Sequence, residues 1–143
     1  MSRKKLIRQL KLKNQKLNQS ELEEVLDIFC KSLVDSLKQG QNIVFDEVCR
    51  RHGDYAMAGL IANIMGSKND IKDLKLVFFA TGDKPDIADK TAELYLDNGY
   101  DYDKLKNSLS SEIDFAGDLN SSSEMKLHLA TVLIKKVLSK LEN

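Results

Sequence analysis

Apolar side chains between residues 19 and 39 recur at steps of three and four, and this periodicity limits the fold most strongly. Acidic and basic side chains separate the apolar positions, which are Leu22, Val25, Leu26, Phe29, Leu33 and Leu37. Such spacing places the apolar residues along one face of a helix. Asn18 and Glu21 fit a capping box at its start, and Gly40 follows its end. The sequence therefore predicts an amphipathic helix over 19–39.

Glycines punctuate the rest of the chain and predict further helices between them. Residues 55–65 are apolar on nearly every face, which is typical of a central, buried helix in which Gly59 permits close packing. Pro85 suits the first turn of a helix. Short strands remain alternatives at 43–45 and 76–79, although we favour a helix through Cys49. The predicted helices cover residues 3–15, 43–49, 55–65, 70–81, 85–98, 102–115 and 122–141.

These elements predict an all-α fold: a single helical domain over 1–143 with about six to eight helices and a central apolar helix near 55–65. A chain of 143 residues has the length of one domain. Apolar residues make up 42% of it and charged residues 31%, which is the composition of a folding chain. No apolar run reaches the roughly 20 residues of a membrane helix, and the N-terminus lacks the apolar core of a secretory signal. We expect a cytoplasmic protein with no membrane contact.

Charge is unevenly distributed although the formal net charge is zero. Residues 1–16 carry seven basic side chains and no acidic one, whereas residues 82–118 carry four lysines and ten acidic side chains. A basic helix over 3–15 could serve as an arm that follows phosphates, releasing counterions as it binds. The other interpretation is a solvated helix face, or an arm paired with the acidic stretch. For nucleic-acid binding the expected contacts are Arg3, Lys4, Lys5, Arg8, Lys11, Lys13, Arg50 and Arg51.

Residues 6–45 resemble the helical hairpin that opens the HU/IHF family of DNA-bending proteins. The resemblance is carried by Leu6-Ile7, the turn before Ser20, Val25-Leu26 and Leu37-Lys38-Gln39-Gly40. It implies a hairpin that dimerises and precedes a β-arm gripping the minor groove. The sequence departs from that pattern after residue 45, where Asp46-Glu47-Val48-Cys49-Arg50-Arg51 replaces the expected strand and arm. DNA bending is therefore not inferred.

One short cluster has residue types used in catalysis. Cys49 and His52 are one helical turn apart, with Asp54 and Tyr55 beside them, so a cysteine-dependent enzyme is a third hypothesis. A buried cysteine and a histidine at a helix end are the more ordinary interpretation. Two histidines and two cysteines are too few for the usual zinc site, and the acidic loop 97–103 lacks the glycine that an EF-hand needs. We expect no metal ion and no cofactor.

The leading hypothesis is a small, non-enzymatic, regulatory or interaction protein. It would bind a protein partner, or a second copy of itself as a homodimer, through a helical face. The helix over 122–141 carries more apolar surface than one packing seam needs, which indicates a subunit contact. The residues expected to bind the partner are Met125, Leu127, Leu138, Tyr100 and Tyr102.

Overall fold

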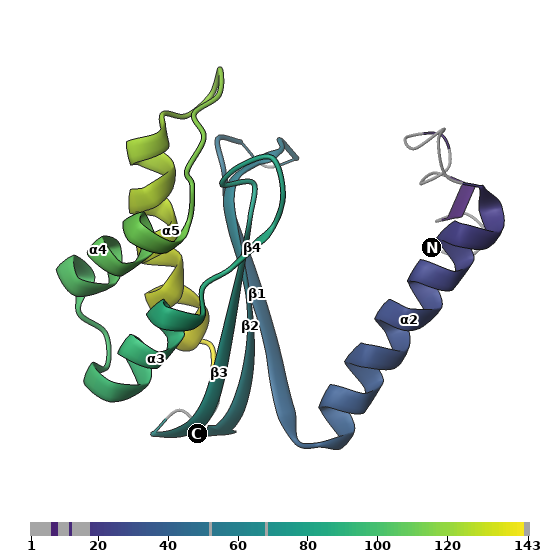
Figure 1. Cartoon of the computed structure of the whole chain (residues 1–143), viewed down its shortest axis with the longest axis horizontal. Coiled ribbons are helices and arrows are strands. Elements are labelled where there is room, and N and C mark those ends of the chain that lie inside the picture. The colour runs from purple at the N-terminus through teal and green to yellow at the C-terminus, as the bar shows by residue number, and fades with distance from the viewer. Residues whose placement is uncertain (1–6, 9–11, 13–17, 52, 68, 142–143) are drawn as a thin grey trace. The chain divides into compact units, whose positions relative to one another are not determined.

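The computed structural model describes residues 7–8, 12, 18–51, 53–67 and 69–141. The chain divides into two compact units, residues 1–39 and residues 40–143. In the described part of the chain the first unit holds helix α2, and the second holds a sheet of four strands with helices α3, α4 and α5 (Figure 1).

Helix α2, Gln19–Lys38, agrees with the helix predicted over 19–39. Asn18 Oδ1 accepts a hydrogen bond from the Glu21 N–H at 2.9 Å, and Glu21 Oε2 accepts one from the Asn18 N–H at 2.7 Å. The predicted capping box is therefore present. Of the predicted basic arm, Arg8 is described; outside the described residues lie Arg3, Lys4, Lys5, Lys11 and Lys13.

The second unit is built on an antiparallel sheet in the order β1-β2-β3-β4. Its strands are β1 (Gln41–Cys49), β2 (Ala56–Ser67), β3 (Asp70–Phe79) and β4 (Asp86–Ile87). Glycine is required at position 66 of β2, where the pairing with β3 shifts register, because φ is +113° and an added Cβ would lie 2.2 Å from the Asp70 carbonyl oxygen.

Three helices cover one face of this sheet (Figure 1). They are α3 (Asp89–Asn98), α4 (Tyr102–Glu112) and α5 (Ser123–Leu138). Helix α5 packs on β1 and β2, α3 packs on β3, and α4 bridges α3 and α5. The core between the layers is fully buried, and its largest side chains are Leu60, Ile64, Leu76, Phe78, Leu105, Leu109, Leu133, Ile134 and Val137.

The all-α prediction is wrong, because three of the predicted helices are strands. The predicted central helix over 55–65 is most of β2, in which Ala58, Leu60, Ala62 and Ile64 are buried. The alternate side chains of β2, such as Ile61 and Met65, are apolar too. Apolar residues on both faces hide the two-residue period that marks a strand. Residues 43–49 and 70–81 likewise form β1 and β3 rather than helices.

Pro85 does not begin a helix, because Asp86 and Ile87 pair with Phe78 and Val77 as β4. Helix α3 starts only at Asp89, and its N-cap residue makes no side-chain hydrogen bond. The cap comes instead from Glu112 at the end of α4. Its carboxylate accepts hydrogen bonds from the N–H groups of Lys90 (2.9 Å) and Thr91 (3.1 Å) and from the Thr91 hydroxyl (2.9 Å).

Two ion pairs link Asp46 of β1 to α5 and to the residues just after it. Asp46 Oδ2 lies 2.9 Å from Lys136 Nζ and 2.8 Å from Lys140 Nζ, and Lys140 also donates to the Phe45 carbonyl oxygen at 3.3 Å. Burial alone would raise the pKa of Asp46, but the hydrogen bonds from Lys140 and Lys136 and from the Glu47 N–H lower it to about 2. Asp46 is therefore ionised at neutral pH.

Candidate functional site

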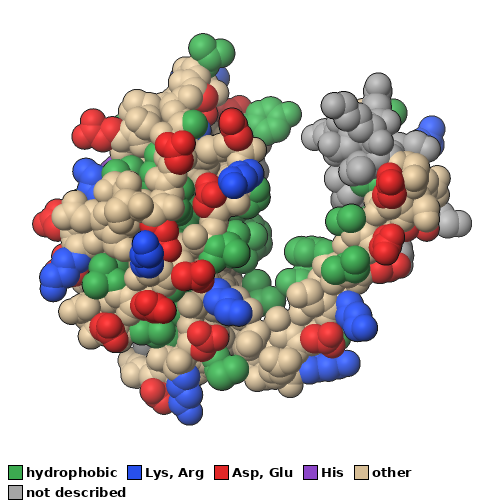
Figure 2. Space-filling model, viewed as in Figure 1, with side chains coloured by type: hydrophobic (Ala, Val, Ile, Leu, Met, Phe, Trp, Pro, Cys, Tyr) green, Lys and Arg blue, Asp and Glu red, His purple; other side chains and the backbone are tan. Residues whose placement is uncertain are grey.

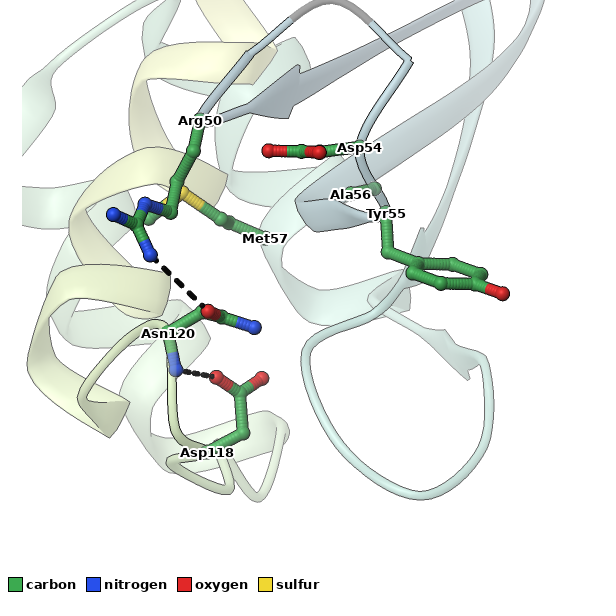
Figure 3. Close-up of a pocket in the computed structure, with 7 residues that line it drawn as sticks. All are labelled: Arg50, Asp54, Tyr55, Ala56, Met57, Asp118 and Asn120. Atoms are coloured by element: carbon green, nitrogen blue, oxygen red, sulfur yellow. Dashed lines mark hydrogen bonds between the residues drawn. The ribbon is translucent and has the colours of Figure 1, made fainter.

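A cavity of about 240 Å³ opens at one end of the second unit, where the turn between β1 and β2 meets the loop that precedes α5. Figure 3 shows side chains from both segments around it. Two stretches of chain far apart in sequence therefore build this site, whose lining residues are Arg50, Asp54, Tyr55, Ala56, Met57, Asp118 and Asn120.

Arg50 closes the gap between the two segments. It follows the last residue of β1, and its Nη1 donates a hydrogen bond to Asn120 Oδ1 at 3.3 Å. A guanidinium has five N–H donors in a planar fork. Within the described residues Arg50 has no ion pair, so most of its donors are available to a bound group.

Asp118 holds the loop on the opposite wall. Its Oδ1 accepts hydrogen bonds from the N–H groups of Asn120 (2.7 Å) and Ser121 (2.9 Å), and its Oδ2 lies 2.8 Å from Lys126 Nζ. Lys126 is buried at the start of α5. The hydrogen bonds from Lys126 and from the backbone lower the pKa of Asp118. This network is structural: it sets where Asn120 stands opposite Arg50.

The turn between β1 and β2 forms the third wall of the cavity. Gly53 adopts a φ of +93°, and the Asp54 N–H donates to the Arg51 carbonyl oxygen at 3.1 Å, which turns the chain back into β2. The Asp54 carboxylate projects toward the side of Arg50, whereas the Tyr55 ring extends away from it (Figure 3). Tyr55 is 89% exposed, which is unusual for so large an aromatic ring.

Three of these lining residues figure in the predictions made from the sequence, Arg50 as a phosphate contact and Asp54 and Tyr55 as neighbours of Cys49. Arg51, the other predicted phosphate contact of this turn, is exposed and does not line the cavity. Met57, Asp118 and Asn120 are not predicted. The only signal near Asn120 is its run of serines, which indicates a turn and nothing about its partner.

The cysteine cluster lacks the features of a nucleophilic site. Cys49 is the last residue of β1 and its thiol donates to Glu47 Oε1 at 3.5 Å. Burial and the neighbouring Glu47 raise the pKa of Cys49, whereas a reactive cysteine needs a lowered one. His52 lies outside the described residues.

The residues predicted to bind a partner do not form one surface. Leu138 belongs to the buried core, and Leu127 and Tyr100 pack against it. Met125 is exposed. Tyr102 meets His128, with its hydroxyl 2.7 Å from Nδ1. Met125 and His128 line a second, shallower cavity of about 280 Å³ between α4 and α5.

Two kinds of feature are missing from the described part of the chain. No three of its histidine, cysteine, aspartate or glutamate side chains lie close enough together to hold a metal ion. Nor does any of its helices combine the length and the apolar character needed to cross a bilayer.

Comparison with known proteins decides the family. Residues 43–141 match the domain family described as the CO dehydrogenase flavoprotein C-terminal domain. The chain belongs to this family. The match begins in β1 and ends just beyond α5, so it covers the sheet, the three helices and both segments of the cavity.

A curated relative supports the assignment. The glyceraldehyde dehydrogenase medium chain of Sulfolobus acidocaldarius is 31% identical over 100 residues, which are 68% of this chain and 36% of that one. The present chain therefore spans about a third of the length of this relative.

Solved structures share the fold. The CO dehydrogenase of Oligotropha carboxidovorans matches with a TM-score of 0.60 at 17% identity over 71% of this chain and 36% of that chain. Quinoline 2-oxidoreductase from Pseudomonas putida 86 matches with a TM-score of 0.59 at 19% identity over 70% of this chain and 36% of that chain. In both, the chain again corresponds to a single portion of a longer polypeptide.

The hypothesis of a non-enzymatic regulatory protein is therefore wrong. The family is that of a dehydrogenase flavoprotein domain, and the proteins that resemble this chain are oxidoreductases. The same finding overturns the alternatives of nucleic-acid binding and of a cysteine-dependent enzyme, since neither describes this family. In place of an all-α regulatory bundle, the chain holds an α/β domain of the CO dehydrogenase flavoprotein C-terminal family.

The family implies a flavin, and the described residues fit only part of one. Cavities that enclose drug-sized ligands measure roughly 300–1,000 Å³, and the cavity at Arg50 is about 240 Å³. The sequence holds no glycine-rich loop of the kind that cradles a pyrophosphate. The described residues therefore do not form a complete site for a flavin dinucleotide. They offer an exposed aromatic ring and a cation, which suit one side of a planar ring system.

Proposed function

We propose that this chain serves as the C-terminal domain of a flavoprotein dehydrogenase and works together with a portion that carries the flavin. The family match over residues 43–141 carries the proposal. The shared fold with two oxidoreductase chains supports it. The name "medium chain" of the relative from Sulfolobus acidocaldarius indicates an enzyme of several chains, so protein partners are part of the proposal.

The cavity at Arg50 and the Tyr55 ring are the part of this domain that would face the flavin. An exposed, rigid aromatic ring gains most when it packs against another flat ring. The unpaired donors of Arg50 suit carbonyl or other acceptor atoms along the edge of such a ring. Asp118 lines the cavity, and its ion pair with Lys126 keeps the opposite wall in place.

Substrate specificity would be determined by other portions of the enzyme. The related proteins are named for carbon monoxide, quinoline and glyceraldehyde, which share neither size nor polarity, yet all three contain this domain. A fold common to such different reactions supports a role for this domain other than choosing the substrate.

The test is to purify the tagged chain from its own source cells under mild conditions. We expect a flavin to accompany it, together with dehydrogenase activity toward an artificial dye, assayed with each of the three named substrates in turn. Tyr55→Ala should lower the turnover and alter the visible flavin spectrum while the flavin content stays unchanged. Leu119→Ala removes another fully exposed side chain from the neighbouring loop and should change neither property. A preparation without flavin or dehydrogenase activity contradicts the proposal.

A further inference from the structure

The face of the sheet opposite the three helices carries a continuous apolar row. Phe45 pairs with Ile61 across β1 and β2, Ile61 pairs with Val77 across β3, and Val77 pairs with Ile87 of β4. Cross-strand partners point to the same face of a sheet. Phe45 is 66% exposed, Ile87 59% and Ile61 38%. Hydrophobic side chains gather along the right-hand edge of residues 40–143 in Figure 2.

The residues of this face are more apolar than those of a typical solvent-exposed sheet face. Antiparallel sheets with a solvated face normally alternate apolar and polar residues along each strand. Here the buried positions of β2 and the opposite positions are both largely apolar, and the Phe79 ring covers Gly59 beside the row. Exposed apolar surface that is contiguous over several strands marks an interaction site.

The strand that carries the row also borders the candidate site. Met57 lines the cavity at Arg50 and is the extra residue of β2 at the bulge where the pairing shifts from Val48–Ala58 to Cys49–Ala56. The cavity therefore lies at the end of β2 that precedes Gly59 and Ile61.

The length of the related proteins indicates what that partner is. The matching portion is 36% of each of three oxidoreductase chains, so those chains contain nearly twice as much polypeptide again outside it. We propose that the open face with the row Phe45–Ile61–Val77–Ile87 docks on the flavin-carrying portion of the enzyme. This inference rests on the proposed function and adds the surface through which the two portions associate. The partner surface is apolar opposite the row and polar where it meets Glu47 and Lys75.

The experiment compares variants of the tagged chain purified from the source cells, with flavin recovered per mole of chain as the readout. Phe45→Lys should lower that ratio at least tenfold, because a charge within the row would be buried without a partner. Threonine also favours strands but carries no charge, so Phe45→Thr should lower the flavin recovered per mole of chain less than Phe45→Lys does. Ile61→Thr should also lower it, whereas Val132→Thr is the matched control on α5, since Ile61 and Val132 are both 38% exposed.

The outcomes separate the two proposals. If the wild-type chain brings no flavin, both proposals fail. If the wild type and Phe45→Lys bring equal amounts of flavin, only the docking surface is wrong. Sedimentation of the isolated chain tests a second copy as the occupant: a wild-type dimer that Phe45→Lys converts to a monomer would overturn the inference. A much larger loss of thermal stability in Ile61→Thr than in Val132→Thr would show that the face is already covered within the chain, and would overturn it too.

Discussion

The ring of Phe79 lies directly over Gly59, its cross-strand partner on β2. A Cβ built at position 59 would lie 2.0 Å from Phe79 Cζ, so the ring occupies the space that any other residue would need. Glycine is expected to weaken a strand interior, and here the aromatic ring compensates by covering the bare backbone.

Gly59→Ala should therefore destabilise the domain by displacing the Phe79 ring into solvent. We expect a loss of about 1–3 kcal/mol in the free energy of unfolding, as for other overpacked positions. In a Phe79→Ala background the same change should be neutral or stabilising, since alanine is then the better strand residue. Urea denaturation of the four proteins in this double-mutant cycle measures the coupling. Equal effects in both backgrounds would show that the ring does not depend on Gly59.

Asp46 should make stability depend on pH in the acid range. Its pKa of about 2 in the folded protein lies below its ordinary value of 3.8. The stabilisation is therefore complete above pH 4 and is lost as the pH falls from about 4 to about 2. We expect Asp46→Asn to lower the free energy of unfolding by about 1–2 kcal/mol at pH 6, allowing for the half-exposed lysines.

Urea denaturation of wild type and Asp46→Asn between pH 2 and pH 6 checks this prediction. The two curves of stability against pH should converge near pH 2. A difference that stays constant down to pH 2 would show that the carboxylate charge is not what matters. Lys136→Met and Lys140→Met should each remove part of the effect, because both ammonium groups contact Asp46 Oδ2.

Glu112 should act as the N-cap of a helix to which it does not belong. Three donors at the start of α3 converge on its carboxylate, and Thr91 among them is completely buried. Glu112→Ala should cost about 1–3 kcal/mol because these donors lose their acceptor. Glu112→Gln, which keeps one oxygen, should cost less. Amide hydrogen exchange at Lys90 and Thr91 should rise selectively in Glu112→Ala, and unchanged protection there would contradict the capping role.

The pair of Asp118 and Lys126 should respond asymmetrically to substitution. Lys126 is buried, so Asp118→Asn leaves an ammonium group without its counter-charge. Lys126→Met leaves a carboxylate that is partly exposed and still accepts two backbone N–H groups. Asp118→Asn should therefore lower the melting temperature more than Lys126→Met. The reverse order in calorimetry would contradict the assigned roles.

The helices were predictable where their ends carry local signals. The capping box of α2 at Asn18 and Glu21 involves neighbouring residues. At the start of α5 the pattern suggests a capping box of Ser121 and Glu124, but the N-cap is one residue later, where the Ser122 hydroxyl accepts from the Met125 N–H. The strands carry weaker signals: the alternatives of short strands at 43–45 and 76–79 lie within β1 and β3. The three- and four-residue spacing of Ile71, Leu74, Val77 and Phe78 resembles that of a helix by chance, because these residues belong to a strand that pairs with β2.

The candidate site was predictable only in part, for the same reason. Arg50 and Tyr55 stand out in the sequence by type, but nothing near them indicates Asn120. The N-terminal cap of α3 was not predictable either. Ala88 has no side chain that can cap the helix, and the capping carboxylate belongs to Glu112 of α4. Local patterns reveal residues whose partners are within one turn, and they miss partners that tertiary packing brings together.

The hydrogen bond between Arg50 and Asn120 spans 70 positions of the chain. Bringing its two ends together closes a long loop of chain, which costs more conformational entropy than a contact between neighbouring residues. The cavity is thus a product of tertiary packing rather than a feature of any single segment. A substitution that loosens α5 would abolish the cavity without changing any of the residues that line it. Binding of a ligand in the cavity would in turn report that the loop before α5 is packed in its folded position.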